Sequence, residues 1–142
     1  MGGAGNDTIY GNWTDGGEGS GRNIIVGGAD SDTLYDYKIA DGAEGKGSIL
    51  IAGNSALGIA NLQAIMSEWS STDSYALRVN RILNGGGFNG STTLQPGVNV
   101  TDDAAINHLW GSTGGSGFNW FLYTLAVDEI NRAKVGETHT HI

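Results

Sequence analysis

Short apolar runs alternate with glycine-rich polar segments in the first third of the chain. The runs at residues 8–10, 24–26, 33–35 and 49–51 are bounded by Gly, Asn, Asp and Ser, which predicts short β-strands between turns. In the first run, Ile9 is expected to point inward while Thr8 and Tyr10 point outward. The spacing of these runs therefore indicates a β-rich N-terminal part.

The apolar spacing changes to a helical period after residue 57. One stripe at i, i+3, i+4 and i+7 consists of Leu62, Ile65, Met66 and Trp69. Polar residues 70–73 interrupt it, a second stripe runs from Ala76 to Leu83, and three glycines at 85–87 end it. We interpret the two helices as a cap on the open end of the β part. The alternative is a ligand groove along the first stripe.

Two nine-residue segments repeat with an offset of 25 residues. Residues 2–10 (GGAGNDTIY) and 27–35 (GGADSDTLY) share paired glycines, an Asp and a large apolar residue, and residues 18–26 and 44–51 repeat as well. A further copy at 114–122 has Asn119 at the Asp position. The expected fold is mainly β, a parallel β-roll or β-solenoid with coils of about 25 residues. A two-helix insertion interrupts the roll, which resumes near the C-terminus. The expected parts of one domain are 1–57, 58–87 and 88–142.

Composition narrows the classes of function. The 142 residues carry a net charge of −8, which argues against nucleic acid and anionic membrane surfaces as partners and suits divalent cations. Cysteine is absent, so no disulfide framework or thiolate metal site is expected. No apolar run is long enough to cross a membrane, and no signal peptide is visible.

Catalytic motifs are absent from the sequence. It contains neither H-E-x-x-H nor G-x-S-x-G, so we expect no metalloprotease or lipase activity, and no enzyme. His139 and His141 could bind a transition metal, but we interpret residues 132–142 as a mobile polar tail.

The repeated nonapeptides resemble those of the RTX (repeats-in-toxin) calcium-binding proteins, which are secreted and mostly bacterial. The segments 49–53, 64–69, 74–79 and 111–122 narrow the resemblance to the C-terminal module of giant surface proteins of planctomycete-type bacteria. The resemblance covers nearly the whole chain and implies an extracellular or cell-surface protein that binds Ca²⁺ between equivalent turns of successive coils.

The resemblance also implies a set of Ca²⁺ ligands. The best site lies between turns 2–7 and 27–32, with side-chain oxygens from Asp7 and Asp32 and backbone oxygens from Gly3, Gly5, Gly28 and Asp30. Asp30 could instead offer its carboxylate. A second ion between turns 27–32 and 52–55 would lack a carboxylate from the third turn. Weaker candidates are Asn119 and the recurring loop acids Asp15, Glu18, Asp41 and Glu44, which could equally be solvated.

The expected function is that of an extracellular structural protein folded and stabilised by Ca²⁺. Residue 2 already belongs to a complete repeat, which suggests either head-to-tail stacking of copies into a filament or a piece of a larger surface protein. The alternative is an adhesin or secretion module that binds a glycan or protein partner. Its aromatic platform would consist of Tyr10, Trp13, Tyr35 and Tyr37.

Overall fold

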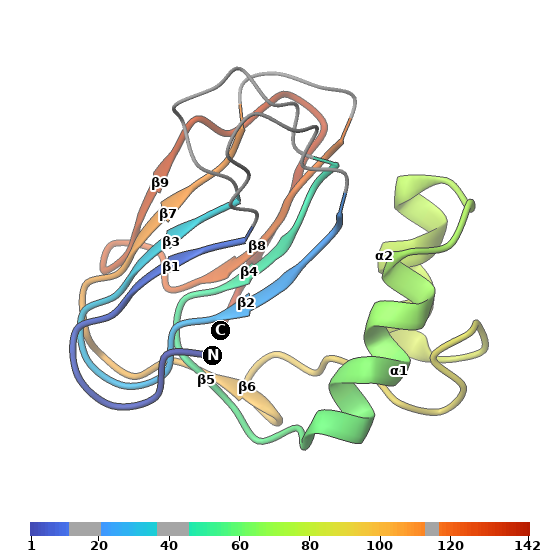
Figure 1. The fold of residues 1–142 in the computed structure, drawn as a ribbon, viewed down its shortest axis with the longest axis horizontal. Helices are drawn as coiled ribbons and strands as arrows, with labels where there is room; N and C mark the ends of the chain where they lie inside the picture. The colour runs from blue at the N-terminus through green and yellow to red at the C-terminus, as the bar shows by residue number, and fades with distance from the viewer. Residues whose placement is uncertain (12–20, 37–45, 113–116) are drawn as a thin grey trace.

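The computed structural model of the chain describes residues 1–11, 21–36, 46–112 and 117–142. They form two four-stranded parallel sheets, a two-stranded antiparallel sheet and two helices (Figure 1). The strands are β1 Thr8–Tyr10, β2 Ile24–Val26, β3 Thr33–Tyr35, β4 Ile49–Ile51, β5 Asn54–Ser55, β6 Val100–Thr101, β7 His108–Trp110, β8 Trp120–Tyr123, β9 Glu129–Asn131 and β10 Thr138–His141. The helices are α1 Ile59–Trp69 and α2 Tyr75–Asn84.

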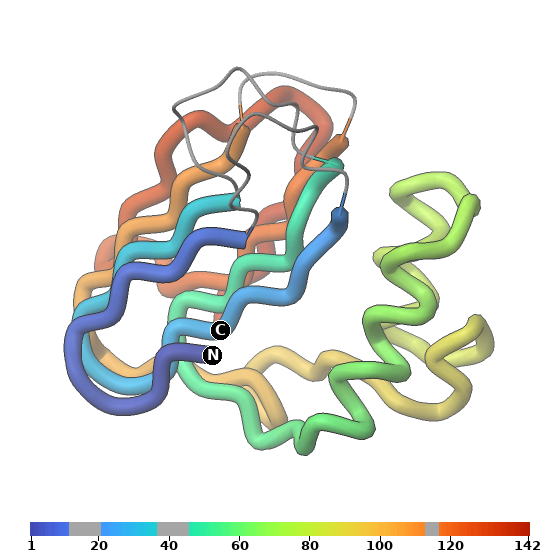
Figure 2. The backbone as a smooth tube through the Cα atoms, viewed as in Figure 1, coloured from blue at the N-terminus to red at the C-terminus, as the bar shows by residue number. Residues whose placement is uncertain are grey.

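The chain alternates between the two parallel sheets. The first sheet has the order β1-β3-β7-β9, and the second has the order β10-β8-β4-β2. Thr8 lies opposite Thr33 and Ile24 opposite Ile49, so the offset of 25 residues is the strand register in the N-terminal part. Figure 2 shows the resulting stack of neighbouring strands.

Two hydrophobic clusters hold the layers together. Between the two parallel sheets lie side chains that include Leu34, Leu50, Leu109 and Phe121, all fully buried. The second cluster lies between the other face of the second sheet and the helices, and includes Ile51, Trp69 and Trp120. The two central strands of the second sheet, β4 and β8, are therefore covered on both faces, which accounts for their continuous apolar runs ILI and WFLY.

The helices form where the apolar spacing predicts them. The side chain of Ser74 caps α2 by accepting a hydrogen bond from the Leu77 N–H, and α2 ends at Gly85, whose φ is 81°. Trp69 Nε1 donates to the Gly47 carbonyl at 3.1 Å, which attaches α1 to the start of the second sheet. Within the described residues, neither helix is long and apolar enough to span a lipid bilayer.

The expected fold class is wrong. The structure is mixed α/β, with two separate parallel sheets, a small antiparallel sheet and a helical layer that shares a core with the second sheet. It is not a roll of equal 25-residue coils. Register offsets grow to 75 residues between Thr33 and His108, then fall to 21 between His108 and Glu129. The domain boundaries expected from the sequence stay a prediction.

The C-terminal segment is not a polar tail. Residues 138–141 form β10, which pairs with β8 along its whole length. The ring centroids of His139 and Phe121 lie 5.3 Å apart, and those of His141 and Tyr123 also lie 5.3 Å apart. The sequence did not indicate this strand because its alternating Thr and His residues are not apolar. The strand forms because β8 supplies backbone hydrogen-bond partners along its length.

Candidate cation site at the acidic turns

Four turns lie side by side at the lower end of Figure 1, each directly before a strand of the first sheet. They comprise residues 2–7, 27–32, 101–107 and 124–128, and we call them the acidic turns. They contain no Lys or Arg, and their six aspartates are Asp7, Asp30, Asp32, Asp102, Asp103 and Asp128. One end of the molecule is therefore strongly negative.

A ladder of side-chain hydrogen bonds connects the acidic turns. The Asp7 N–H donates to Asp32 Oδ1 at 2.8 Å, and the Asp32 N–H donates to Asn107 Oδ1 at 2.8 Å. The Asn107 N–H in turn donates to Asp128 Oδ1 at 2.9 Å. Positions 32, 107 and 128 need a short side chain with an acceptor oxygen. Without it, the backbone N–H of the equivalent residue in the neighbouring turn would lack a partner.

The second carboxylate oxygens of the first three turns are not satisfied in this way. Within the acidic turns, four buried carboxylate oxygens accept no hydrogen bond from the described residues: Oδ2 of Asp7, Asp32 and Asp103, and Oδ1 of Asp102. Asp128 differs, because its Oδ2 accepts from the Thr124 N–H at 2.7 Å. No donor of the described residues therefore offsets the charge on these oxygens of the first three turns, whereas both oxygens of Asp128 accept hydrogen bonds.

The leading glycines make room for these carboxylates. A Cβ atom added to Gly2 would collide with Asp7 Oδ2, and one added to Gly27 would collide with Asp32 Oδ2. Gly28 has φ 114° and lies against Gly3, with which it forms a parallel bridge. The paired glycines therefore serve close packing of the turns as well as left-handed backbone.

Burial raises the pKa of Asp32 above its ordinary value. The carboxylates of Asp7, Asp103 and Asp30 raise it further, while the hydrogen bond from the Asp7 N–H opposes the shift. The pKa of Asp128 is also raised by burial. Both shifts indicate that the folded chain has too little positive charge near these groups to stabilise their ionised forms.

The structure brings the best predicted ligands together in the first two acidic turns. They are Gly3, Gly5, Asp7, Gly28, Asp30 and Asp32. Two of their oxygens already accept hydrogen bonds: Asp30 Oδ2 from the Gly5 N–H at 3.0 Å, and the Gly3 carbonyl from the Ala29 N–H at 2.7 Å. No group of three His, Cys, Asp or Glu side chains among the described residues is arranged to hold a metal ion.

Turn 52–55, which the sequence suggested as a third turn without a carboxylate, does not lead into the first sheet. Asn54 and Ser55 form β5, which pairs with β6, and the neighbour of β3 is β7. Asp102 and Asp103 therefore enter the site from a segment that sequence reasoning missed. A short motif at the start of each strand of the first sheet could have revealed this segment. It consists of an Asp or Asn, then a polar residue, then Ile or Leu, and it occurs at residues 7–9, 32–34, 107–109 and 128–130.

The weaker predicted ligands are not in the acidic turns. Asn119 precedes β8 in the second sheet, where its Oδ1 accepts from the Ser48 N–H at 2.7 Å and its Nδ2 donates to Glu137 Oε1 at 3.0 Å. Asn119 thus connects Ser48 and Glu137 by hydrogen bonds at the start of the second sheet, away from the acidic turns. Asp15, Glu18, Asp41 and Glu44 lie outside the described residues.

An aromatic ladder runs across the outer face of the first sheet. Tyr10 stacks on Tyr35 at 4.8 Å between ring centroids, Tyr35 stacks on Trp110 at 5.8 Å, and Arg132 lies 5.5 Å from the Trp110 centroid. Stacked rings cover one another's faces, whereas a sugar platform needs exposed faces. Trp13 and Tyr37, the other expected platform residues, lie outside the described residues.

Comparison of the chain with protein-family models, curated proteins and solved structures finds no significant match.

Proposed function

We propose that this chain is an extracellular, calcium-stabilised structural protein without catalytic activity. The observation that supports it is the set of four buried carboxylate oxygens without donors in turns that hold six aspartates and no basic residue. Ca²⁺ takes six to eight oxygen ligands, including carboxylates and backbone carbonyls, and this end of the molecule offers both. Asp7, Asp30, Asp32 and Asp103 are the proposed side-chain ligands, with carbonyls of Gly3, Gly5 and Gly28. No three of these described side chains surround one point in the structure, so Ca²⁺ binding would have to draw them together.

The hydrogen bonds within the acidic turns favour a weak site. Ca²⁺ must share Asp30 Oδ2 with the Gly5 N–H and the Gly3 carbonyl with the Ala29 N–H. Extracellular calcium modules bind with dissociation constants of about 10⁻⁴ to 10⁻³ M, and such a site fills only where Ca²⁺ is millimolar. A site of this affinity would be filled in a calcium-rich extracellular medium, as the proposal requires.

Calcium-dependent unfolding tests the proposal. With 10 mM Ca²⁺ in place of EDTA, we expect the free energy of unfolding to rise by about 2.7 kcal/mol if the ion is at a hundred-fold excess over its dissociation constant, and by less at lower excess. Asp32→Asn keeps the acceptor for the Asp7 N–H and removes the charge. It should be at least as stable as wild type in EDTA and should lose most of the calcium response.

Asp73→Asn is the matched control. Asp73 lies between the helices and pairs with Arg81, so its loss lowers stability equally with and without Ca²⁺. Equal unfolding curves of the wild type in Ca²⁺, Mg²⁺ and EDTA would refute the proposal. So would a calcium response that Asp32→Asn retains in full.

The structural role we propose includes head-to-tail addition of copies. β1 and β2 are the outermost strands at one edge of the two parallel sheets, and β9 and β10 are outermost at the other. The Asp7 carbonyl and the Gly11 N–H both bond toward β3, so the alternating Thr8 N–H faces away from it. Such edges are templates for another strand, and pairing of β9 with β1 of the next copy, together with pairing of β10 with its β2, would extend both sheets.

Sedimentation velocity with Ca²⁺ tests this assembly. We expect particles that grow with protein concentration, and Thr8→Pro should shift them to monomer by removing the outward N–H without touching the bonds to β3. Thr138→Ala, on the β10 face that carries the helices, serves as a control that keeps the backbone donors. A wild type that stays monomeric at high concentration would favour the alternative, a module of a larger surface protein or adhesin.

A further inference from the structure

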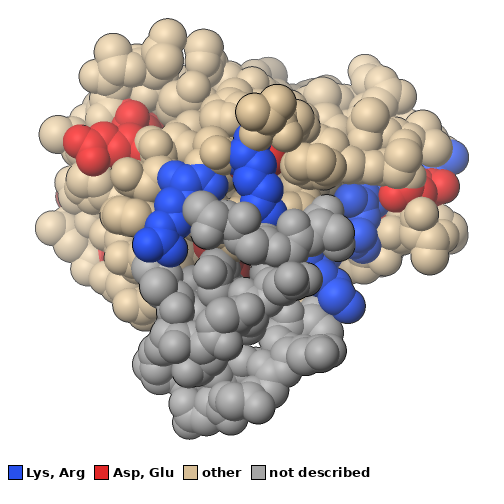
Figure 3. Space-filling view, turned by 90° about the horizontal axis from the view of Figure 1, so that it is seen from above, with Lys and Arg blue, Asp and Glu red and all other residues tan. Residues whose placement is uncertain are grey.

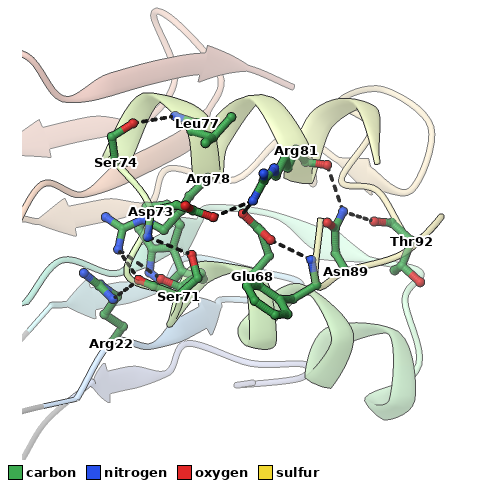
Figure 4. Close-up of polar contacts among 12 residues, drawn as sticks. Arg22, Glu68, Ser71, Asp73, Ser74, Leu77, Arg78, Arg81, Asn89 and Thr92 are labelled. Atoms are coloured by element: carbon green, nitrogen blue, oxygen red, sulfur yellow. Dashed lines mark hydrogen bonds and ion pairs between the residues drawn. The ribbon is translucent and has the colours of Figure 1, made fainter. Parts of the chain in front are cut away.

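Two guanidinium groups converge on one backbone carbonyl beside the start of α2. Arg22 Nη1 donates to the Ser71 carbonyl at 3.1 Å, and Arg78 Nη1 donates to the same oxygen at 3.4 Å and to the Trp69 carbonyl at 3.3 Å. Figure 4 shows both groups on the same side of Ser71. Arg22 comes from the segment before β2 and Arg78 from α2, so only the tertiary structure brings them together.

Among the described residues, no carboxylate forms an ion pair with Arg22 or Arg78, although Glu68 and Asp73 lie near enough to offset part of the Arg78 charge. The two nearby acids, Glu68 and Asp73, both pair with Arg81, and Glu68 Oε2 also accepts from the Phe88 N–H at 2.7 Å. The Nε atoms of Arg22 and Arg78 are buried and make no hydrogen bond among the described residues. Two positive charges therefore share one neutral acceptor and retain free N–H donors.

The surroundings make this arrangement costly without a counter-ion. Arg78 is 4% exposed, and its guanidinium lies 5.1 Å from the centroid of the Trp69 ring, which offsets part of its charge. Arg78 also lies in the first turns of α2, whose N-terminal dipole repels a cation, and that first turn has no acidic residue. Several Lys and Arg side chains gather on the face in Figure 3, opposite the acidic turns.

We propose that Arg22 and Arg78 form a binding site for an oxyanion with at least two acceptor oxygens. A carboxylate or sulfate oxygen would accept from the N–H groups that the chain leaves unused, and planar guanidinium forks suit such bidentate contacts. The site lies away from the acidic turns and does not depend on calcium binding there. Sulfate groups and carboxylates are the two sources of this chemistry that the test separates.

The test titrates sodium sulfate or sodium acetate from 0 to about 5 mM into the full chain. Calcium is fixed at 1 mM, and chloride keeps the ionic strength constant. These concentrations are too low for the general stabilising effect of sulfate. We expect saturable shifts of the Arg22 and Arg78 Nε–H resonances in ¹⁵N-resolved NMR spectra and a rise in the thermal midpoint. A stronger response to sulfate identifies a sulfate site, and a stronger response to acetate identifies a carboxylate site.

Variants separate a specific site from general charge screening. Arg22→Gln should weaken anion binding about ten-fold or more, because hydrogen bonds to charged groups contribute most of the affinity. It should be no less stable than wild type in chloride, since it removes the repulsion and keeps a donor for Ser71. Arg132→Gln, which changes a cation on the first sheet, should bind the anion as wild type does.

Two results would overturn the proposal. One is the absence of a saturable shift at Arg22 and Arg78 with either anion. The other is an equal response from wild type and Arg22→Gln, which would assign the effect to screening. A lower stability of Arg22→Gln in chloride, together with no anion response, would show that the arginines are balanced by the chain itself.

Discussion

At the scale of single residues, the tightest constraints lie where a side chain occupies the space next to a glycine. Gly27 is such a position, because Asp32 Oδ2 and the Ala52 carbonyl both lie against its α-carbon. Sequence patterns identify the glycine but not its neighbour. A larger residue at position 27 would therefore clash with its neighbours, and it would also displace the buried carboxylate of Asp32.

Gly27→Ala is expected to lower the free energy of unfolding by about 1–3 kcal/mol, the usual cost of forcing extra atoms into a packed site. Urea unfolding measures the change. Gly58→Ala is the matched control, because a Cβ atom at Gly58 meets nothing within 4 Å, and its effect should stay within about 0.5 kcal/mol. Equal losses at both positions would contradict the steric argument.

Burial of acids predicts an unusual dependence of stability on pH. The pKa values of Asp32, Asp36 and Asp128 are raised, mainly by burial, above the ordinary value of 3.8. Their contribution to stability is fully present below the unfolded pKa and is lost as pH rises through the folded pKa. In EDTA, the free energy of unfolding should therefore increase as pH falls through the raised pKa values toward 4.

Urea unfolding at several pH values between 7 and 4 checks this prediction. Asp32→Asn should show a weaker dependence than wild type, because one of the three groups no longer titrates. Addition of 10 mM Ca²⁺ should reduce the slope or reverse it, because the proposed ligands must be ionised. A steady loss of stability as pH falls from 7 to 4 in EDTA would contradict the prediction.

At the scale of elements, α2 is tied to the second sheet through one hydroxyl group. Tyr75 OH donates to the Asn119 carbonyl at 2.7 Å and accepts from the Thr138 N–H at 2.7 Å. Burial raises the pKa of Tyr75, so the hydroxyl stays protonated. The same group thus joins the start of α2 to the first residues of β8 and β10.

Tyr75→Phe should lower the free energy of unfolding by about 1–3 kcal/mol, since it leaves a buried N–H and a buried carbonyl unpaired. Tyr35→Phe is the control, because the Tyr35 hydroxyl makes no hydrogen bond in the described part of the structure and only its ring stacks. Urea unfolding compares the two. A loss of less than 0.5 kcal/mol for Tyr75→Phe would show that the tie is dispensable.

At the scale of the whole molecule, the layers differ in how well they are covered. The second sheet lies between the first sheet and the helices, and residues 49–51 and 120–122 are fully buried. β1 is an outermost strand whose Thr8 and Tyr10 face solvent. The end formed by the acidic turns has six aspartates and no Lys or Arg, whereas the face in Figure 3 carries both basic and acidic side chains.

Native-state hydrogen exchange should reflect this layering. The slowest amide protons are expected in β4 and β8, with protection near the free energy of global unfolding, because both strands have neighbours on each side. Amides of β1 should exchange faster under conditions where copies do not associate. Uniform protection across the two sheets would contradict the layered arrangement as the source of stability.

Local structure was largely predictable from the sequence. Helical spacing located α1 and α2, and the repeated nonapeptides located β1 and β3 in register, because these signals depend on residues close together in the chain. The Asp7 and Asp32 pairing followed from the same repeat. The sequence did not predict β10, because its Thr and His residues lack the apolar pattern of a strand.

Long-range neighbours were decided only by the tertiary structure. The chain leaves the sheets after β4 and returns at β7, so Asp103 rather than turn 52–55 supplies the third set of carboxylates. The fold became mixed α/β because Trp69 and the helices bury the outer face of the second sheet. The convergence of Arg22 and Arg78 on Ser71 arises from that same packing. Sequence determines which segments are strands, helices and turns, whereas burial and pairing across the insertion determine which turns meet.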